Sequence, residues 1–501
     1  MKPVNQNETP ILDALMDYVN EKTIPFHVPG HKQGRGNKAL TSILSSTALS
    51  IDLSCMEDLD NICNPKSVIK EAENLAADLY QAENAFFLVN GTTSGIQAMI
   101  MSVCNPGDKI ILPRNAHKSA IGGIILSGAH PIYIEPEIDP FWGIAMGVTP
   151  RKVRETLELH PDAKAVFVIN PTYYGIASNL KEIVEIAHSC DVPVLVDEAH
   201  GAHLVFHEDL PLSAMEAGAD LAASSTHKLA GSLTQSSILL HQGKLINPEY
   251  VKAVLNLTQT TSPSYILLAS LDIARKEMAL SGQERVIKTI ELTRKAKKEL
   301  KKIPGIYVLD ADILDNNGKY ALDHTKLVIN VRELGFSGYE IERIMRKDYH
   351  IQVELSDLYN IIALVTIADD DLTMEAFINA FKEIVSSRPA NKIVRYAFDL
   401  PNLPEQKILP RQAFYGETHI VPLSEAVGEV SAEMIMAYPP GIPLICPGEI
   451  ITKEIIEYVQ LLHTEEAQLQ GTQDPRVRNI KVLNHRLVLL QNQNDSIQNA
   501  G

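Results

Sequence analysis

The hydrophobic residues between positions 66 and 242 alternate between two periods. Short apolar runs, of the length of buried strands, are separated by stretches in which apolar residues recur at helical spacing. The helical stretches lie at about 66–82, 93–103, 117–127, 150–160 and 179–189, and the runs are Phe86–Val89, Lys109–Leu112, Pro131–Ile134, Ala165–Ile169, Val192–Val196, Leu221–Ala223 and Ser237–Leu240. Strands separated by such helices predict an α/β fold with a mostly parallel seven-stranded sheet, covered on both faces.

The rest of the chain predicts smaller parts around this sheet. An amphipathic helix is expected at 8–22, long helices at 245–300, and a helix near 451–462. Residues 306–384 mix strand-like runs with helices, and the Gln- and Asn-rich tail beyond His463 predicts partial disorder. We therefore expect an N-terminal arm (1–65), a large domain (66–300), a small α+β domain (301–388) and a C-terminal domain (389–501).

The bulk properties of the chain restrict its partners and its compartment. The formal net charge over 501 residues is −17, which disfavours nucleic acid or an anionic membrane as a partner because like charges repel. The five cysteines are scattered and form no Cys-x-x-Cys pair, which is typical of a reducing compartment. No run of about 18 apolar residues occurs. We expect a cytoplasmic protein whose acidity suits a cationic small molecule.

The first apolar run is followed by a candidate phosphate site. Ligands on parallel sheets bind beside the carboxyl ends of the strands, and the segment Asn90–Gly95 (N-G-T-T-S-G) opens a predicted helix there. Glycine lets the backbone approach an anion, and hydroxyls and N–H groups at a helix N-terminus bind phosphate. A plain helix cap is the alternative. The segment lacks the Gly-Lys-Ser/Thr ending of a P-loop.

Three further strand ends carry residues with matching chemistry. His117 follows the second run, where its ring can stack on a planar cofactor or simply cap a helix. Asp197 ends the fifth run, and a buried carboxylate needs a cation such as a protonated pyridine nitrogen. Lys228 follows the sixth run in the stretch Ser224–Leu229, where a shielded setting can lower the pKa of its amine. Together these features predict a pyridoxal phosphate (PLP) site, with Lys228 as the covalent attachment.

The motifs of the chain resemble those of the fold type I PLP-dependent ornithine/lysine/arginine decarboxylases, from about Thr9 to Glu449. The motifs are Phe26–Gly34 (F-H-V-P-G-H-K-Q-G), Asn90–Ser94, Arg114–Ser119 (R-N-A-H-K-S), Asp197–His200, Ser225–Lys228 (S-T-H-K), and Ala432–Pro443 followed by Pro447–Glu449. This resemblance implies removal of the α-carboxylate of a basic amino acid as CO₂, and a large domain like that of aspartate aminotransferase.

The resemblance also implies roles for individual residues. Lys228 carries PLP, Asp197 pairs with its ring nitrogen, and His117 stacks on its ring; Lys228 or His227 returns a proton to the substrate. The remaining cofactor-binding residues are expected to be Gly91, Thr92, Thr93, Ser94, His200, Ser225 and His227. Glu433 is similar to the carboxylate that holds the distal cation of the substrate in shorter family members, and Arg35 is a second candidate for the substrate site.

Two departures from the family pattern affect the substrate and the assembly. The large inducible members begin with a receiver-like domain that this sequence does not show, so we expect a homodimer or a dimer-based oligomer. His200 stands where inducible members carry a tryptophan. The likeness is greatest to the shorter, biosynthetic-type arginine decarboxylases, so arginine is the expected substrate and agmatine the expected product. Lysine and ornithine remain open.

Three other functions compete with this interpretation. His200, His203 and His207 suggest the ligands of a metal-dependent hydrolase, but Gly201 and Val205-Phe206 disfavour the helix that would bring them together. An aminotransferase of the same fold type would need an arginine for the substrate carboxylate, for which the candidates are Arg332, Arg343 and Arg346. A non-catalytic binding protein that retains the cofactor would have no need of the complete Lys–Asp–His set.

Overall fold

The chain forms two compact units in the computed structural model, which describes residues 5–315, 317–387, 401–437 and 441–484. The first unit contains residues 1–102 and 193–288, and the second contains 103–192 and 289–501. The predicted large domain, 66–300, therefore contributes residues to both units.

All seven predicted runs are strands, and the structure assigns them to one sheet. The first unit contributes four strands in the order β1-β10-β9-β8, and the second contributes β6-β2-β3. Their bounds are β1 (Asn84–Leu88), β2 (Lys109–Pro113), β3 (His130–Ile134), β6 (Ala165–Ile169), β8 (Val194–Asp197), β9 (Leu221–Ser224) and β10 (Ser237–His241).

The strands of the first unit do not all run in the same direction. β8 and β9 are parallel, whereas β10 is antiparallel to both of its neighbours, β9 and β1. β8, β9 and β10 are buried along their whole length, as expected for strands covered on both faces. The first residue of β10 therefore lies level with the last residues of β1 and β9.

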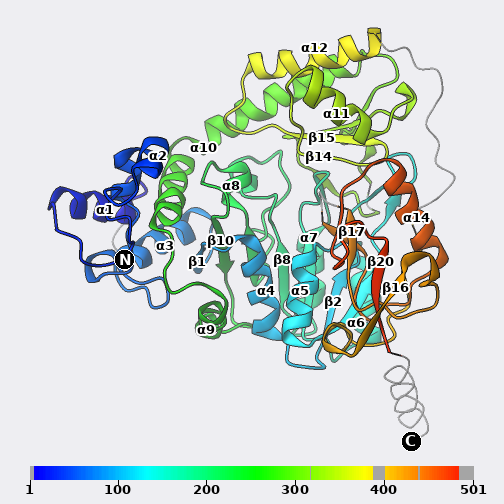
Figure 1. Cartoon of the computed structure of the whole chain (residues 1–501), viewed down its shortest axis with the longest axis horizontal. Coiled ribbons are helices and arrows are strands. Elements are labelled where there is room, and N and C mark those ends of the chain that lie inside the picture. The colour runs from blue at the N-terminus through cyan, green and yellow to red at the C-terminus, as the bar shows by residue number, and fades with distance from the viewer. Residues whose placement is uncertain (1–4, 316, 388–400, 438–440, 485–501) are drawn as a thin grey trace, which may run out of the picture. The chain divides into compact units, whose positions relative to one another are not determined.

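The predicted helices of the first unit are present, together with two, α2 and α8, that the sequence did not predict. α1 packs on α3, and α3 packs on β1 (Figure 1). The residues of α2 are mostly exposed, so this helix has no strong apolar period, and α8 has only four residues, too few to show one. The helices that begin in this unit are α1 (Pro10–Asn20), α2 (Lys38–Ser50), α3 (Val68–Leu79), α4 (Gly91–Val103), α8 (Thr226–Leu229), α9 (Pro248–Thr258) and α10 (Tyr265–Leu300).

The second unit adds the predicted helices α5 (Lys118–Ser127), α6 (Pro150–Leu159) and α7 (Leu180–His188) to its part of the main sheet. A four-stranded sheet has the order β11-β13-β15-β14, and its central strands β13 (Lys326–Asn330) and β15 (Asn360–Leu364) match the predicted runs of the small domain. Its outer strands and helices are β11 (Tyr307–Val308), β14 (Leu355–Ser356), α11 (Gly338–Asp348) and α12 (Asp371–Ser387).

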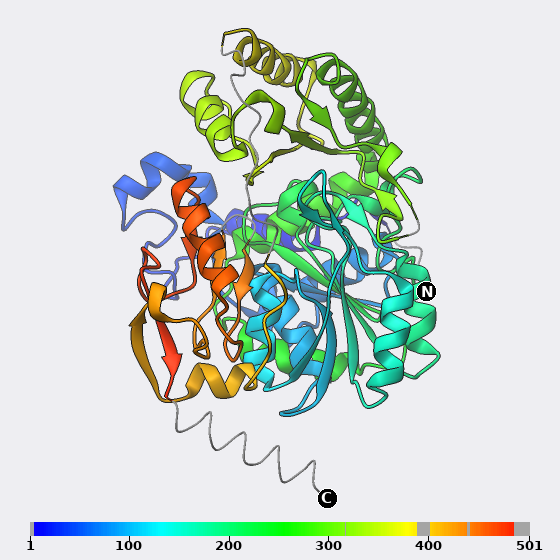
Figure 2. The same ribbon diagram turned by 90° about the vertical axis from the view of Figure 1, so that its right-hand side faces the viewer.

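The C-terminal part of the second unit contains two further small sheets. β16 (Thr418–Pro422) pairs with β20 (Asn479–Leu483), seen in Figure 2 as an orange strand beside a red one. The tail for which we predicted partial disorder thus includes a paired strand; residues after 484 lie outside the described part. The other elements are α13 (Pro410–Tyr415), α14 (Lys453–Thr464), β17 (Ile435–Ala437), β18 (Ile442–Ile445) and β19 (Leu469–Gln470).

A buried ion pair on α10 holds the start of the chain. The guanidinium of Arg275 and the carboxylate of Asp272 are 2.9 Å apart, and both side chains are fully buried. Arg275 donates hydrogen bonds to the carbonyl oxygens of Gln6 and Glu8, while Asp272 accepts one from the backbone N–H of Ile11. These contacts make residues 6–11 part of the folded first unit, and breaking such a pair by removing one partner costs about 3–5 kcal/mol.

No helix in the described ranges is long and apolar enough to span a membrane.

Glu73 makes the stability of the first unit depend on pH. Its side chain is buried on α3, one carboxylate oxygen accepts the backbone N–H of Phe87 at 3.1 Å, and burial raises its pKa to about 7. Because the folded state holds a proton that the unfolded state releases above pH ~4.5, stability should fall as the pH rises from ~4.5 to 7, by about 3 kcal/mol in total. Glu73→Gln should remove this loss, so thermal unfolding midpoints of the variant and the natural protein should diverge between pH 5 and pH 8.

Glu71 on the same helix provides the matched control, because its side chain is exposed. Glu71→Gln should change the thermal unfolding midpoint by the same amount at pH 5 and at pH 8. If the Glu73→Gln midpoint keeps a constant offset from that of the natural protein across this range, the Glu73 carboxyl is not the titrating group.

Candidate active site

Lys228 lies at the carboxyl edge of the first unit's strands. β9 ends at Ser224, and the short helix α8 turns directly after it, so the lysine projects from the first helical turn. Its Nζ atom lies 3.0 Å from Nε2 of His200, a buried residue of the loop that follows β8. Because β8 and β9 are parallel and adjacent, their carboxyl ends bring these two side chains together. The sequence predicted His200 as a cofactor residue but did not predict its contact with Lys228.

Asp197 is the last residue of β8 and is almost fully buried. Its Oδ1 accepts a hydrogen bond from the backbone N–H of Ala199 at 3.1 Å. Burial raises the pKa of Asp197, and the positive charge of Lys228 opposes that shift. Asp197 ends β8 and Lys228 follows the adjacent strand β9, and their predicted roles in binding the cofactor stay predictions. A cationic ligand group beside Asp197 would stabilise its charged form.

The predicted phosphate segment opens α4, as expected. Gly91 has φ +73°, a conformation that favours glycine. Thr92 is buried, and its Oγ1 lies 2.5 Å from Oγ of Ser225, which precedes α8. Ser94 is also buried and donates to the carbonyl of Gly91 at 2.8 Å, whereas Thr93 is exposed. Hydroxyls from two separate motifs thus meet at the N-terminus of a 13-residue helix, a setting that suits an anion.

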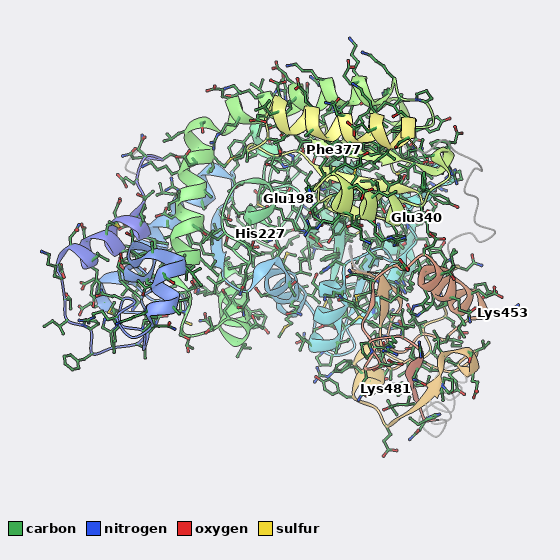
Figure 3. All side chains as sticks on the ribbon, turned by 45° about the horizontal axis from the view of Figure 1, so that its top comes forward. Glu198, His227, Glu340, Phe377, Lys453 and Lys481 are labelled. Carbon is green, nitrogen blue, oxygen red and sulfur yellow. The ribbon has the colours of Figure 1, made fainter. Side chains whose placement is uncertain are left out.

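The imidazole of His227 has a hydrogen-bond partner of its own in the first unit. Its Nδ1 lies 2.7 Å from the carbonyl oxygen of Ser236, so Nδ1 carries a proton and donates it, which leaves Nε2 as the acceptor in the neutral ring. Burial lowers the pKa of His227, and the neighbouring lysine lowers it further. The neutral imidazole is therefore favoured at neutral pH. Figure 3 marks His227 and Glu198, both in the first unit.

His117 and Arg35 each have a hydrogen-bond partner within their own unit. His117 belongs to the second unit, where it caps α5 by accepting the backbone N–H of Ser119. Arg35 is an exposed residue of the first unit, and its Nε donates to the carbonyl of Lys32 at 3.3 Å. Their predicted roles in stacking and in substrate binding stay predictions.

Glu433 has partners of its own within the second unit. It is buried, and its two carboxylate oxygens accept the backbone N–H groups of Gln473 and Lys481 at 2.8 and 2.9 Å. A substrate-binding role stays a prediction and must be separated from this structural one. The Tyr438–Pro440 turn beside which it was placed lies outside the described residues.

An ion pair that sequence reasoning did not predict joins two of the quoted motifs. Arg114 donates to both carboxylate oxygens of Glu449, at 3.1 and 2.9 Å, and to the carbonyl oxygens of Pro443 and Leu444. Glu449 is fully buried and also accepts the N–H of Cys446. The two residues are 335 positions apart in the sequence, so no local pattern indicates the contact.

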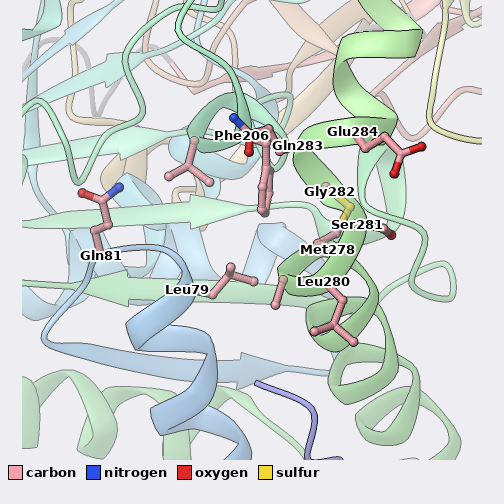
Figure 4. Close-up of a pocket in the computed structure, with 11 residues that line it drawn as sticks. Leu79, Gln81, Phe206, Met278, Leu280, Ser281, Gly282, Gln283 and Glu284 are labelled. Carbon is pink, nitrogen blue, oxygen red and sulfur yellow. The ribbon is translucent and has the colours of Figure 1, made fainter. Parts of the chain in front are cut away.

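A pocket of about 470 Å³ lies beside the 3-10 turn η2 (Leu204–Phe206), away from this site. Phe206 and Gly282 contribute to its walls (Figure 4). A Cβ atom at Gly282 would lie 2.9 Å from the Phe206 ring, so glycine allows this packing. Neither Lys228 nor Asp197 lines the pocket.

The metal-hydrolase alternative finds no support in the first unit. His200 contacts Lys228, and Nδ1 of His207 accepts the backbone N–H of Asp209. Across the described ranges, no three His, Cys, Asp or Glu side chains are grouped as metal ligands.

Comparison with solved structures defines the class of fold. A lysine decarboxylase of Francisella novicida superimposes with a TM-score of 0.83 at 24% sequence identity, covering 95% of this chain and 81% of that one. The predicted fold class, an α/β enzyme of fold type I with smaller α+β parts, is thereby confirmed.

Comparison of sequences defines the family. The major domain of the Orn/Lys/Arg decarboxylases matches residues 9–373, and their C-terminal domain matches residues 391–475. An arginine decarboxylase of Bacillus subtilis is 46% identical over 483 residues, 96% of this chain and 99% of that protein. An arginine decarboxylase of Halalkalibacterium halodurans is 47% identical over 481 residues, 95% and 98% of the respective lengths.

The chain belongs to the Orn/Lys/Arg decarboxylase family. It is a PLP-dependent amino-acid decarboxylase of this type, which confirms the resemblance of the quoted motifs.

Proposed function

We propose that this enzyme removes the α-carboxylate of L-arginine as CO₂ and releases agmatine. The proposal is supported by two relatives named arginine decarboxylase that match nearly the whole chain at 46% and 47% identity. The structural observation that carries it is the contact of Lys228 with His200 at 3.0 Å, at the strand edge where Asp197 is buried.

The residues of the first unit fit PLP. The buried carboxylate of Asp197 suits a protonated ring nitrogen, because a cation offsets the cost of burying its charge. The α4 N-terminus with Thr92 and Ser225 suits the phosphate group. Lys228 supplies the amine for covalent attachment. We assign Gly91, Thr93 and Ser94 to the phosphate end and His117 to the face of the ring.

When bound, PLP supplies an electron-poor ring that accepts the electron pair left at Cα as CO₂ departs. Asp197 keeps the ring nitrogen protonated through its negative charge. His200 contacts the Lys228 Nζ atom at 3.0 Å, so the amine is positioned before the cofactor binds. The proton returned to Cα comes from Lys228 or His227. Because Nδ1 of His227 donates a hydrogen bond to the carbonyl of Ser236, His227 would have to deliver this proton from Nε2.

We further propose that the enzyme works as a homodimer or a dimer-based oligomer in the cytoplasm. All five cysteines are free, which suits a reducing compartment. Light scattering should give at least twice the mass of one chain, and a monomer that decarboxylates arginine at full rate would contradict this.

Incubation of the purified protein with arginine, lysine and ornithine separately, followed by identification of the amine, tests the proposed substrate. We expect agmatine at a rate well above that of cadaverine or putrescine. If cadaverine or putrescine predominates, the enzyme acts on lysine or ornithine instead. If a keto acid forms without CO₂, the reaction is an amino transfer.

The aminotransferase alternative has little support from its candidate arginines. Arg332 lies 4.2 Å from the ring of Tyr359 and donates to the carbonyl of Phe141. Arg343 donates to the carbonyl of Glu465 and pairs with Glu466. Both guanidinium groups therefore contribute to the packing of the second unit. Arg346 is exposed on α11.

Glu433→Gln tests whether that carboxylate binds the distal cation of the substrate. We expect the KM for arginine to rise about 10- to 100-fold, because hydrogen bonds to charged groups contribute about 1.5–3 kcal/mol, while the absorbance of the bound cofactor stays the same. Steady-state kinetics and visible spectra measure the two effects.

The competing structural role predicts a different result for the same variant. The NH₂ group of the new glutamine would face the backbone N–H of Gln473 or Lys481, and two donors cannot form a hydrogen bond with each other. The thermal unfolding midpoint would therefore fall while the KM for arginine stayed constant. Glu425→Gln, at an exposed position of the same unit, is the control for unspecific effects on kinetics.

A further inference from the structure

A chain of three buried hydroxyl groups runs through the proposed phosphate end of the site. Thr92 Oγ1 is its centre, 2.5 Å from Oγ of Ser225 on one side and 2.8 Å from Oγ of Ser237 on the other. Ser237 is fully buried. Ser225 and Thr92 belong to the motifs described above, but Ser237 belongs to none of them. We refer to these three residues as the hydroxyl chain.

The direction of β10 explains why Ser237 lies there. β10 runs antiparallel between β1 and β9, so its first residue is placed opposite their last residues. In the ladder, Ser237 pairs with Leu88, and Ile238 pairs with Ser224. In β1, β8 and β9 the candidate functional residues lie at or after the last residue of the strand. In β10 the hydroxyl belongs to Ser237, the first residue of the strand.

The residues just before Ser237 support the same region. The carbonyl of Gln235 accepts the backbone N–H of Gly91 at 2.8 Å, and its amide donates to the carbonyl of Val89 at 2.7 Å. The carbonyl of Ser236 accepts Nδ1–H of His227 at 2.7 Å. The segment 235–237 therefore contacts both the phosphate segment and the turn that carries Lys228.

The number of protons in the hydroxyl chain limits how it can be ordered. Each hydroxyl has one proton to donate, and the two O···O contacts use two of the three. One proton is left for an acceptor outside the chain. If Ser237 donates to Thr92 and Thr92 donates to Ser225, the remaining proton is on Ser225, next to the S-T-H-K turn. A phosphate at the α4 N-terminus favours this order because a phosphate oxygen accepts the hydrogen bond from the Ser225 hydroxyl.

We propose that Ser237 is a positioning residue for the cofactor phosphate: its hydroxyl donates to Thr92 and thereby directs the Ser225 proton towards the phosphate. This inference rests on the proposed binding of PLP by the first unit. Without Ser237, the Thr92–Ser225 pair has no fixed donor order, and the phosphate loses a consistently oriented hydrogen bond.

The test compares Ser237→Ala with the natural protein, using PLP and its phosphate-free analogue pyridoxal as probes. We expect the Kd for PLP to rise at least about fivefold, the scale of one lost hydrogen bond, and the Kd for pyridoxal to change less than twofold. The ³¹P NMR shift of bound PLP should move as well. These readouts do not require turnover.

Ser224→Ala is the matched control, because Ser224 is a buried serine at the end of the adjacent strand and its Oγ has no hydrogen-bond partner among the described residues. It should leave both Kd values unchanged. If Ser237→Ala lowers the thermal midpoint of the apoprotein, Ser237→Cys keeps the side-chain volume with a much weaker donor and should weaken PLP binding in the same way.

Several outcomes would overturn the inference. They are an unchanged PLP Kd in Ser237→Ala or Ser237→Cys, an equal loss of PLP and pyridoxal binding, and an unmoved ³¹P shift. Failure of the natural protein to bind PLP would instead overturn the proposed cofactor site itself, so the two failures are distinguishable.

Discussion

Lys228→Ala should abolish covalent attachment of PLP and reduce arginine decarboxylation by at least about 10⁴-fold, the scale seen when a covalent catalyst is removed. The amine is the only nucleophilic group that we assign to the cofactor, and His200 positions it at 3.0 Å. Borohydride reduction followed by peptide mass analysis should find the cofactor on residue 228 of the natural protein and on no peptide of the variant.

Lys228→Arg separates the chemistry of this residue from its charge. The guanidinium keeps a positive charge beside Asp197 and His200, but it stays protonated and does not act as a nucleophile. We expect this variant to fold and to lose covalent attachment as completely as the alanine variant. Covalently bound PLP at another residue, with activity retained, would show that position 228 is not the attachment site.

Asp197→Asn should lower kcat by about 100- to 1000-fold, a loss typical of removing one preorganised electrostatic group. The amide is similar in size to the carboxylate but cannot stabilise a protonated ring nitrogen by charge. Some PLP should still bind through Lys228 and the phosphate end. Steady-state kinetics on PLP-saturated protein measure the effect, and a kcat within a few fold of the natural value would remove Asp197 from its assigned role.

The neighbouring residue Glu198 offers a matched control for this experiment. It is also buried, and its Oε1 accepts the backbone N–H of Ala214 at 2.6 Å. Burial raises its pKa to about 8, so the carboxyl is protonated at pH 7 and Glu198→Gln leaves the charge of the site unchanged there. This variant should keep most of its activity at pH 7. A loss as large as that of Asp197→Asn would indicate a general sensitivity to changes on this loop.

The strands and the position of the chemistry were predictable because both depend on local sequence. Most of the apolar runs are buried on both faces, although β3 is only partly buried, so their hydrophobic residues are continuous and mark the strands. Residues such as Asp197 and Lys228 follow directly after runs, where a parallel sheet collects its functional groups. The prediction therefore placed them at one strand edge without knowledge of any tertiary contact.

Ser237 was not predicted as a site residue, because candidate residues were expected only at the carboxyl end of each strand. One signal was present in the sequence. Only residues 225–236 separate β9 from β10, which is shorter than most crossover connections between parallel strands. A connection this short is near the minimum for a parallel crossover and therefore favours an antiparallel β10, with its first residue at the site.

Contacts between distant segments could not be predicted from one sequence. Arg114 and Glu449 are each ordinary charged residues in the sequence, and only the fold of the second unit brings them together. The same holds for Glu433, whose carboxylate is satisfied by backbone N–H groups 40 and 48 positions away. These charged residues are buried in the folded protein. A single sequence gives no indication that a charged residue will be buried, because its partners lie far away along the chain.

The ion pair on α10 has a practical consequence for anyone who shortens the protein. Arg275 depends on the carbonyl groups of Gln6 and Glu8, and Asp272 depends on the amide of Ile11. An expression clone that starts after these residues would leave both charges in a dry interior with only each other for compensation. Aggregated material is the expected yield from such a clone, so purification tags should be added ahead of residue 1 of the sequence rather than in place of residues 6–11.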